Sequence, residues 1–246
     1  MLDDKLPDLQ QPDTETRGTP SLTASVYDRM REDVLSGRLA PDAKLRIDML
    51  RTRYSVGSTP LREALTRLAG DGLITHEDQK GFRVAAVSRA EMRELVLTRC
   101  WLEEIALREA IARGDESWEE RVVLAHHRLS RTPRSAKADQ FAPNDDWEHR
   151  HRAFHLTLIS ACGSRWLLQY CTQLHDQADR YRRIAVVASY PQRDELAEHT
   201  RIKDAALARD TAAATQMLQA HFQRTAAIIV ESIPEKLPRK TRRKAD

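Results

Sequence analysis

The segment LRTRYSVGSTPLREALTRLAGDGLI, which begins at Leu50, places the strongest constraint on the fold of this 246-residue chain. Apolar residues recur at helical spacing in two short stretches, one on each side of a turn at Gly57 and Ser58. The first stretch holds Ile47, Leu50 and Tyr54, and the second holds Leu61, Ala64, Leu65 and Leu68. Thr59 and Pro60 are typical of the N-cap and first position of a helix. Two short helices joined by so tight a turn predict a helix-turn-helix.

Elements on both sides complete a winged version of this unit. Upstream, apolar residues at helical spacing begin after Ser21 and end at Gly37, which predicts a preceding helix. Downstream, GLITHEDQKGFRVAAVS alternates apolar residues around a Gln-Lys-Gly turn, as a small hairpin does. We therefore predict a winged helix-turn-helix domain over residues 21–88.

Side chains on the outer face of the second helix and at the hairpin turn are candidates for contact with DNA. They are Ser58, Thr59, Arg62 and Thr66 on the helix, and Lys80 and Gly81 at the turn. Arg62 can bond a guanine edge or hold a phosphate, and Ser58 and Thr59 can donate to phosphates at the helix N-terminus. The hairpin can enter the neighbouring minor groove, with Gly81 letting the backbone approach closely. The alternative for Arg62 is an ion pair with a neighbouring acidic residue.

The sequence after Ser88 is helical throughout. Apolar residues keep helical periodicity in about six stretches, at residues 90–113, 116–131, 145–162, 164–188, 192–209 and 211–232. The short links between them predict an all-helical antiparallel bundle over residues 89–233, so the chain as a whole belongs to the mainly α class. The sequence has no Gly-rich phosphate loop and no GxSxG nucleophile elbow.

Composition describes an ordinary globular protein with two tails. The chain is 41% hydrophobic and 31% charged, and no apolar run approaches the ~18 residues of a membrane helix. Residues 1–20 are polar and acidic, which predicts disorder and no secretory signal. Residues 234–246 are basic and are either a solvated end or a source of non-specific phosphate affinity. Cys100, Cys162 and Cys171 lack CxxC spacing, which favours reduced core thiols in a cytoplasmic protein.

Four of the nine histidines have a spacing of interest. His151 and His155 are four residues apart and share one helix face, and His199 and His221 lie within the last two predicted helices. Imidazoles from three facing helices can bind one divalent ion, and nitrogen ligands favour Zn²⁺ or Ni²⁺. By spacing alone, however, a histidine pair in a charged helix is more often exposed on the surface. We expect the others considered to face solvent, namely His126, His127, His149 and His175.

The helix-turn-helix segment resembles the winged DNA-binding domain of the GntR family of regulators. The resemblance is carried by KLR at residues 44–46, by STPLREAL and by GFRV in the hairpin. It implies a dimer that binds a short pseudo-palindromic operator, with Arg62 in contact with DNA. Many members have Arg where this chain has Ser58, and Arg or Glu where it has Asp48. Contacts made by those arginines are therefore not carried over, and the operator sequence stays open.

The segment HRAFHLTLISACGSRWLL resembles the first ligand helix of the effector domain in FadR-type members of the same family. In many of these an Asp and a His, four residues apart, join two later histidines around a metal. The resemblance implies His155, His199 and His221 as ligands. His151 stands in place of the Asp, so the site has either four histidines or three, with His151 turned away.

The same resemblance implies a small carboxylate effector beside the metal. A guanidinium can bind a carboxylate through two hydrogen bonds, and Arg99 falls where relatives carry a pocket-facing arginine. Further candidates for effector binding are Arg180, Arg183 and Tyr181 in the segment DRYRRI, although a surface charge is the alternative for each arginine. After residue 22 the chain resembles the glutarate-responsive repressors of this family, which implies glutarate or a related C5 dicarboxylate.

Together these features predict a homodimeric repressor that releases operator DNA when the effector binds, and not an enzyme. One alternative is a regulator that senses the metal itself or holds it only for structure. The other is a metal-dependent hydrolase, against which no glutamate accompanies the histidines at HExxH-like spacing.

Overall fold

The N-terminal part of the chain combines three helices with a three-stranded antiparallel sheet. The elements are α1 Leu22–Leu35, β1 Lys44–Leu45, α2 Ile47–Tyr54, α3 Ser58–Gly70, β2 Ile74–Glu77 and β3 Gly81–Val84. The sheet order is β1-β3-β2, so the predicted hairpin of β2 and β3 is present. The two-residue strand β1, which no sequence pattern indicated, pairs Lys44 with Arg83 and Leu45 with Phe82.

This structure is a computed structural model, and it describes residues 21–77, 79–137, 141–185 and 193–233. The segment 1–20 expected to be disordered and the basic tail 234–246 lie outside the described residues. The predicted break between the helical stretches 164–188 and 192–209 also lies outside them.

The turn of the helix-turn-helix differs from expectation by two residues. Ser55 ends α2 with a φ of 55°, in the left-handed region. The next helix begins at Ser58 with Gly57 as its N-cap, so the prediction of Thr59 as the N-cap is wrong. Pro60 still lies in the first turn, where backbone amides have no intrahelical partner and the missing N–H of proline costs nothing.

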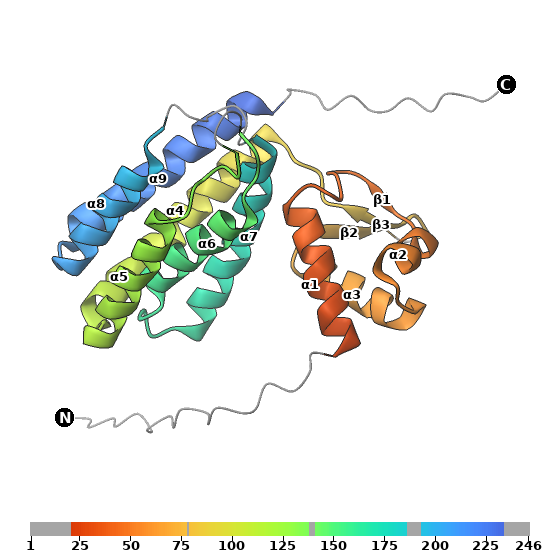
Figure 1. Cartoon of the computed structure of the whole chain (residues 1–246), viewed down its shortest axis with the longest axis horizontal. Helices are drawn as coiled ribbons and strands as arrows, with labels where there is room; N and C mark the ends of the chain where they lie inside the picture. The colour runs from red at the N-terminus through yellow and green to blue at the C-terminus, as the bar shows by residue number, and fades with distance from the viewer. Residues whose placement is uncertain (1–20, 78, 138–140, 186–192, 234–246) are drawn as a thin grey trace.

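Helices make up the rest of the described chain. They are α4 Arg89–Arg113, α5 Glu116–Ser130, α6 Asp145–Ile159, α7 Arg165–Ala185, α8 Glu195–Leu207 and α9 Thr211–Ser232. Helix α4 packs against α6, α7 and α9, while α5 packs against α6 and α8 (Figure 1). The mainly α class, with a small wing and a helical bundle, is confirmed.

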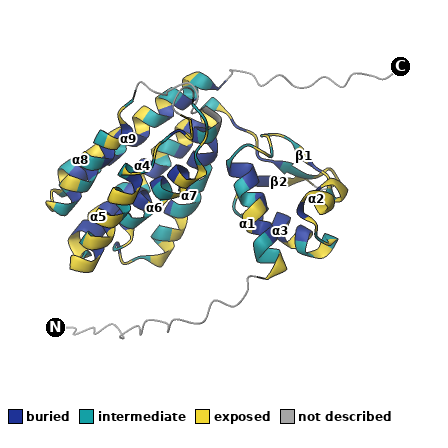
Figure 2. Cartoon of the chain, viewed as in Figure 1, coloured by how far each residue is buried: buried dark blue, intermediate teal, exposed yellow. Residues whose placement is uncertain are grey.

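Each half has its own buried apolar residues, and Figure 2 shows these faces turned inward. One cluster joins α1, α2, α3 and the sheet, and two further clusters lie in the bundle, the smaller of them between α4, α7 and α9. All three cysteines are buried free thiols. Among the described residues, none of the helices combines the length and the apolarity that crossing a bilayer requires.

The two halves lie side by side, with α1 against α7 (Figure 1). Polar contacts from one face of α7 hold them together. The carboxylate of Asp176 pairs with Arg31 of α1 at 2.5 Å, and Arg183 pairs with Glu32 at 2.8 Å. Arg180 donates to the backbone carbonyl of Ala85 at 2.9 Å, just after β3. Helix α7 therefore belongs to the bundle and also forms the surface against which the N-terminal domain packs.

Candidate functional site

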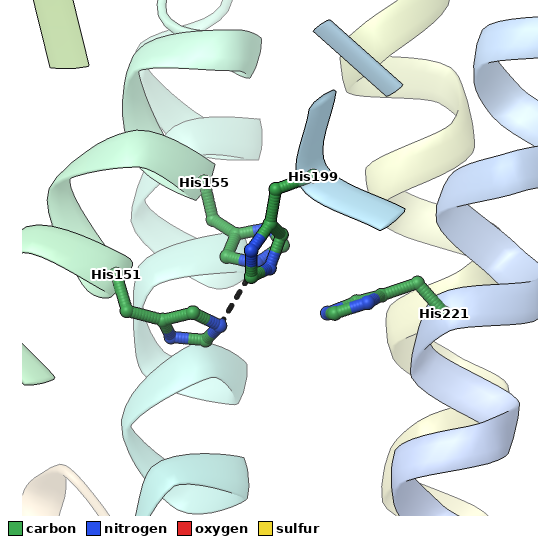
Figure 3. Close-up of side chains that lie close together, drawn as sticks. All are labelled: His151, His155, His199 and His221. Atoms are coloured by element: carbon green, nitrogen blue, oxygen red, sulfur yellow. Dashed lines mark hydrogen bonds between the residues drawn. The ribbon is translucent and has the colours of Figure 1, made fainter. Parts of the chain in front are cut away.

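Four histidines converge between helices α6, α8 and α9. His151 and His155 come from consecutive turns of α6, His199 from α8 and His221 from α9, and Figure 3 shows the four rings gathered around one point. Each offers a ring nitrogen, and these atoms all lie within 4.8 Å of one another. The Nε2 atoms of His151 and His155 are 3.2 Å apart. The structure therefore brings together all four histidines singled out by the sequence.

Burial keeps these imidazoles neutral. No more than 5% of any of the four residues is exposed. Burial lowers the pKa of each ring below the ordinary histidine value, and neighbouring positive charge, such as Arg182 beside His151, adds to the effect. A neutral imidazole has one nitrogen lone pair free, which is what a metal ion requires.

Carboxylate contact fixes the ring of His221. Glu198 lies 2.8 Å from Nδ1 of His221, which leaves Nε2 as the atom available to a metal. Burial alone would raise the pKa of Glu198, but hydrogen bonds with His221 and Arg193 outweigh it and hold this pKa well below its usual range. A carboxylate behind a histidine is the usual outer partner of a metal ligand.

The set fits a nitrogen-bound divalent ion on two observations. Ligands about 2.0–2.1 Å from a tetrahedral ion lie roughly 3.3 Å apart, close to the 3.2 Å between His151 and His155. Nε2 of His199 is buried and has no hydrogen-bond partner among the described residues. Such an orphaned nitrogen calls for a ligand, because an unpaired buried polar atom is costly.

A fifth histidine borders the cluster, contrary to expectation. His175 was expected to face solvent, but it is only 2% exposed and lies on α7 beside Asp179, 3.4 Å away. Arg99 donates to its Nδ1 at 3.2 Å. His151, His175 and Asp179 also lie close enough to form a second metal-ligand set. The spacing His175, Asp179, Arg182 on one helix face was the signal that could have revealed this contribution.

A small cavity of about 20 Å³ adjoins the histidines, enough for about one water molecule. Its charged lining comes from Arg99, Arg182, Asp179 and Glu195, and its apolar lining includes Met92, Phe222 and Ile229. Both cavity arginines already have partners. Arg99 pairs with Glu103 at 2.8 Å and Arg182 pairs with Glu148 and Asp179.

Of the four residues proposed for effector binding, only Arg99 lines this cavity. Arg180 and Arg183 instead bond the N-terminal domain, and the hydroxyl of Tyr181 donates to Glu91. The reason is helical phase. Positions 180, 181 and 183 are turned away from the face of His175, Asp179 and Arg182, and Arg182 is the arginine of this segment that reaches the cavity.

The candidate DNA contacts lie along α3 and at the tip of the wing. Thr59, Arg62 and Thr66 are exposed, and Ser58 is half-buried at the start of the helix. Within the described part of the chain Arg62 has no ion pair, whereas Lys80 pairs with Glu77 at 2.6 Å. Gly81 has a φ of +79°, a conformation that favours glycine at this tight turn.

Two family models match the chain. Residues 22–84 match the model for bacterial regulatory proteins of the gntR family, and residues 94–224 match the FCD domain. The chain is 38% identical over 209 residues to the HTH-type transcriptional regulator BphR of Paraburkholderia xenovorans (strain LB400), covering 85% of each chain. It is 36% identical over 211 residues to the HTH-type transcriptional repressor GlaR of Escherichia coli (strain K12), covering 84% of this chain and 95% of GlaR.

Solved structures show the same fold. A GntR-type transcriptional regulator from Rhodococcus sp. RHA1 matches with a TM-score of 0.70 at 24% identity, covering 87% of this chain and 100% of the other. McbR/YncC of E. coli matches with a TM-score of 0.72 at 21% identity, covering 87% and 99%. The matching families and relatives are transcriptional regulators and not enzymes, which removes the hydrolase alternative. The chain therefore belongs to the GntR family of bacterial regulatory proteins and carries an FCD domain behind its winged helix-turn-helix.

Proposed function

We propose that this chain is a homodimeric repressor whose winged domain, residues 21–88, binds operator DNA. Its helical domain, residues 89–233, binds a divalent metal and a small carboxylate effector that releases the operator. The relative GlaR is described as a transcriptional repressor, which supports repression as the mode of action. Glutarate or a related C5 dicarboxylate is the effector proposed.

The DNA-binding assignment is supported by the exposed face of α3. Arg62 and Thr66 lie on that face, with Ser58 and Thr59 at its N-terminus, where backbone amides attract phosphate oxygens. Arg62 is the residue proposed to read a base edge, because an exposed guanidinium without an internal partner is free to bond one. Lys80 and Gly81 are proposed to contact the backbone from the wing.

The observation that carries the effector domain's function is the buried cluster of four imidazoles. His151, His155, His199 and His221 are proposed to hold one Zn²⁺ or Ni²⁺ ion. When bound, the ion supplies a Lewis acid that accepts a carboxylate oxygen. Four histidines close a tetrahedral shell, so a role in effector binding favours an ion with more than four coordination positions, such as Ni²⁺.

Arg99 is proposed to hold the effector carboxylate from the cavity side. The cavity of about 20 Å³ has no room for glutarate, so the bundle must open for the effector to bind. An effector that binds only the opened arrangement shifts the population toward it, because a ligand acts through its difference in affinity between two states. The contacts of α7 with α1 give this opening a direct mechanical connection to the DNA-binding domain.

A second candidate is a regulator that responds to the metal alone. The small cavity and the fully paired arginines Arg99 and Arg182 favour it, since neither leaves an obvious place for an organic ligand. The two candidates differ in whether metal without a dicarboxylate changes operator affinity.

Homodimerisation is supported by an exposed apolar stripe on α4. Leu97, Trp101 and Ile105 are spaced four residues apart and are 49%, 57% and 41% exposed. Trp166 and Tyr170 are exposed in the same way on the neighbouring helix α7. Contiguous apolar side chains of this size are typical of a protein interface, and a second copy of the chain is the proposed occupant.

Fluorescence anisotropy of metal-loaded protein on the DNA upstream of its own gene tests the proposal. Millimolar glutarate should weaken binding, and acetate at the same concentration should not. Metal-free protein titrated with Ni²⁺ or Zn²⁺, in the absence of glutarate, tests the second candidate. Operator affinity that follows the metal and ignores glutarate would sink the dicarboxylate effector and favour metal sensing.

A further inference from the structure

A second, larger cavity lies on the other side of the histidine cluster. Its volume is about 240 Å³, and it is enclosed by the end of α5, the following loop, the start of α6 and the first turns of α8. Its lining includes Arg134, Trp147, Arg193, Glu195 and His199. His199 therefore forms part of a wall between this cavity and the proposed metal position.

Glu195 lines both cavities, and the two arginines of the larger cavity surround it. One oxygen, Oε1, lies 3.1 Å from Nη2 of Arg134 and 3.7 Å from Nη1 of Arg193. The residue is only 7% exposed. The buried carboxylate of Glu195 thus lies between the two cavities and contacts both guanidinium groups.

The pairing of Glu195 with Arg134 is incomplete. Oε2 of Glu195 and Nε of Arg134 are both buried and have no hydrogen-bond partner among the described residues. A guanidinium normally binds a carboxylate through two parallel hydrogen bonds, one of which can use Nε. The two groups therefore share one ion-pair contact, and a second donor and a second acceptor are left unused.

Arg193 differs from Arg134 in this respect. It holds both oxygens of Glu198 and also donates to Thr225 and to the backbone of His221. Arg193 thus helps to support His221, whereas Glu195 is the ion-pair partner recorded for Arg134 in the described residues. Arg134 is the guanidinium that a new carboxylate can take over at least cost.

We propose that the cavity at Arg134 is a carboxylate-binding subsite, and that Glu195 is its internal occupant, which an incoming small carboxylate displaces. The displaced Glu195 side chain no longer separates the two cavities, so the carboxylate gains access to the metal position. This inference rests on the proposed function, because it identifies where a carboxylate effector first binds. The ligand class is a small organic carboxylate, since the group that holds the place now is itself a carboxylate.

The test is calorimetric titration of metal-loaded protein with glutarate, compared across three single variants. Glu195→Gln removes the competing charge at constant shape and should tighten glutarate binding about tenfold. Arg134→Gln removes the guanidinium and should weaken binding about tenfold. Arg131→Gln is the matched control, because Arg131 is exposed on the same segment and does not line the cavity.

The double variant Glu195→Gln/Arg134→Gln distinguishes a contact from general electrostatics. If Arg134 holds the ligand, the gain from Glu195→Gln must disappear when Arg134 is absent. Unchanged metal stoichiometry and circular dichroism show that each variant is folded. The subsite is refuted if the Glu195 and Arg134 variants bind glutarate as Arg131→Gln does.

Operator anisotropy of the same proteins separates this proposal from the proposed function. If glutarate releases the operator equally from all variants, the subsite is wrong and the effector assignment stands. If glutarate releases nothing but binds Glu195→Gln through Arg134, the subsite stands and the effector assignment is wrong. If glutarate binds neither the wild type nor any variant, both are wrong.

Discussion

Each histidine of the cluster offers one ring nitrogen as a metal ligand, the one that faces the other three histidines. His155 is 2% exposed and lies between His151 and the rings contributed by α8 and α9, with ring centroids 5.1 Å from His199 and 5.2 Å from His221. Its other ring nitrogen has no hydrogen-bond partner in the described residues. A buried nitrogen without a partner is costly, and a bound ligand would offset that cost.

Replacing His155 should therefore abolish stoichiometric metal binding. We expect His155→Ala to lose metal affinity by more than about 100-fold, since even outer-shell substitutions cost about 10–100-fold. Glu198→Gln, which weakens the support of His221, should fall in that lower range. Metal content after dialysis and competition with a chelator measure both. His149→Ala, on the exposed side of α6, is the control, and equal affinity in all three proteins would contradict the site.

Acidification should unfold the metal-free protein more readily than the loaded protein. Burial lowers the pKa of the cluster histidines, so below about pH 6.5 the unfolded chain binds protons that the folded chain resists. Stability is then present above that pH and is lost as the pH falls, by up to about 1.4 kcal/mol per pH unit for each histidine. Urea unfolding between pH 7.5 and 5.5 measures the slope. A slope unaffected by His155→Ala would exclude these rings as its source.

At the scale of elements, helix α3 is built to present one face and bury the other. Leu61, Ala64, Leu65 and Leu68 are fully buried, and the remaining positions between Leu61 and Leu68 are exposed. The exposed positions can therefore change without disturbing the domain core. This separation makes the contribution of a single surface arginine measurable.

Arg62→Gln should lower operator affinity without lowering stability. We expect a loss of about 1–3 kcal/mol if Arg62 reads a base edge, because a bidentate contact with a base is of that size. Anisotropy on the operator and on operators changed one base pair at a time measures both affinity and specificity. Arg108→Gln, exposed on α4, is the control. Weakening that is equal on all sequences would make Arg62 a phosphate contact instead.

Periodicity was sufficient to predict most of these elements but not their edges. The helices from α1 to α9 and the hairpin are predicted by the spacing of their apolar residues, and the structure contains all of them. Strand β1 has two residues and carries no period, and the N-cap of α3 depends on a backbone turn that Thr59 and Pro60 do not specify.

The sequence predicted site residues in two ways only. Some share one helix face, and others were implied by the family resemblance. His151 and His155 are visible as a pair because they share α6. His175 carried a weaker signal, the spacing of His175, Asp179 and Arg182 on one face of α7, and its contact with Arg99 forms only when α4 and α7 are packed together. Arg182 lines the cavity and Arg183 does not, because one position along a helix is about 100° around its axis.

At the scale of the whole molecule, the apolar stripe on α4 is the surface proposed to join two chains. Trp101 lies at its centre and is more than half exposed. Burying it against a second copy would remove a large apolar area from water, and an introduced charge there would be left without a partner.

Trp101→Glu should therefore convert the dimer to a monomer at micromolar concentration. Sedimentation equilibrium measures the change, and operator affinity should fall with it, since a palindromic site needs two winged domains. Val123→Glu is a matched control, because Val123 is 48% exposed on α5, away from the stripe. A dimer that survives Trp101→Glu but not Val123→Glu would place the interface on α5.

Helix α7 presents two sets of side chains on two of its faces, and both sets repeat with the same helical spacing over seven residues. His175, Asp179 and Arg182 face the cavity, and Asp176, Arg180 and Arg183 face the DNA-binding half, each set one residue from the other. Rotation or displacement of the helix to suit a different ligand must also move the second set. Under the proposed function, ligand preference and unliganded operator occupancy are consequently not separate traits. Selection for a new inducer would then alter the basal expression of the regulated genes, and compensating substitutions are to be sought in α1 at Arg31 and Glu32.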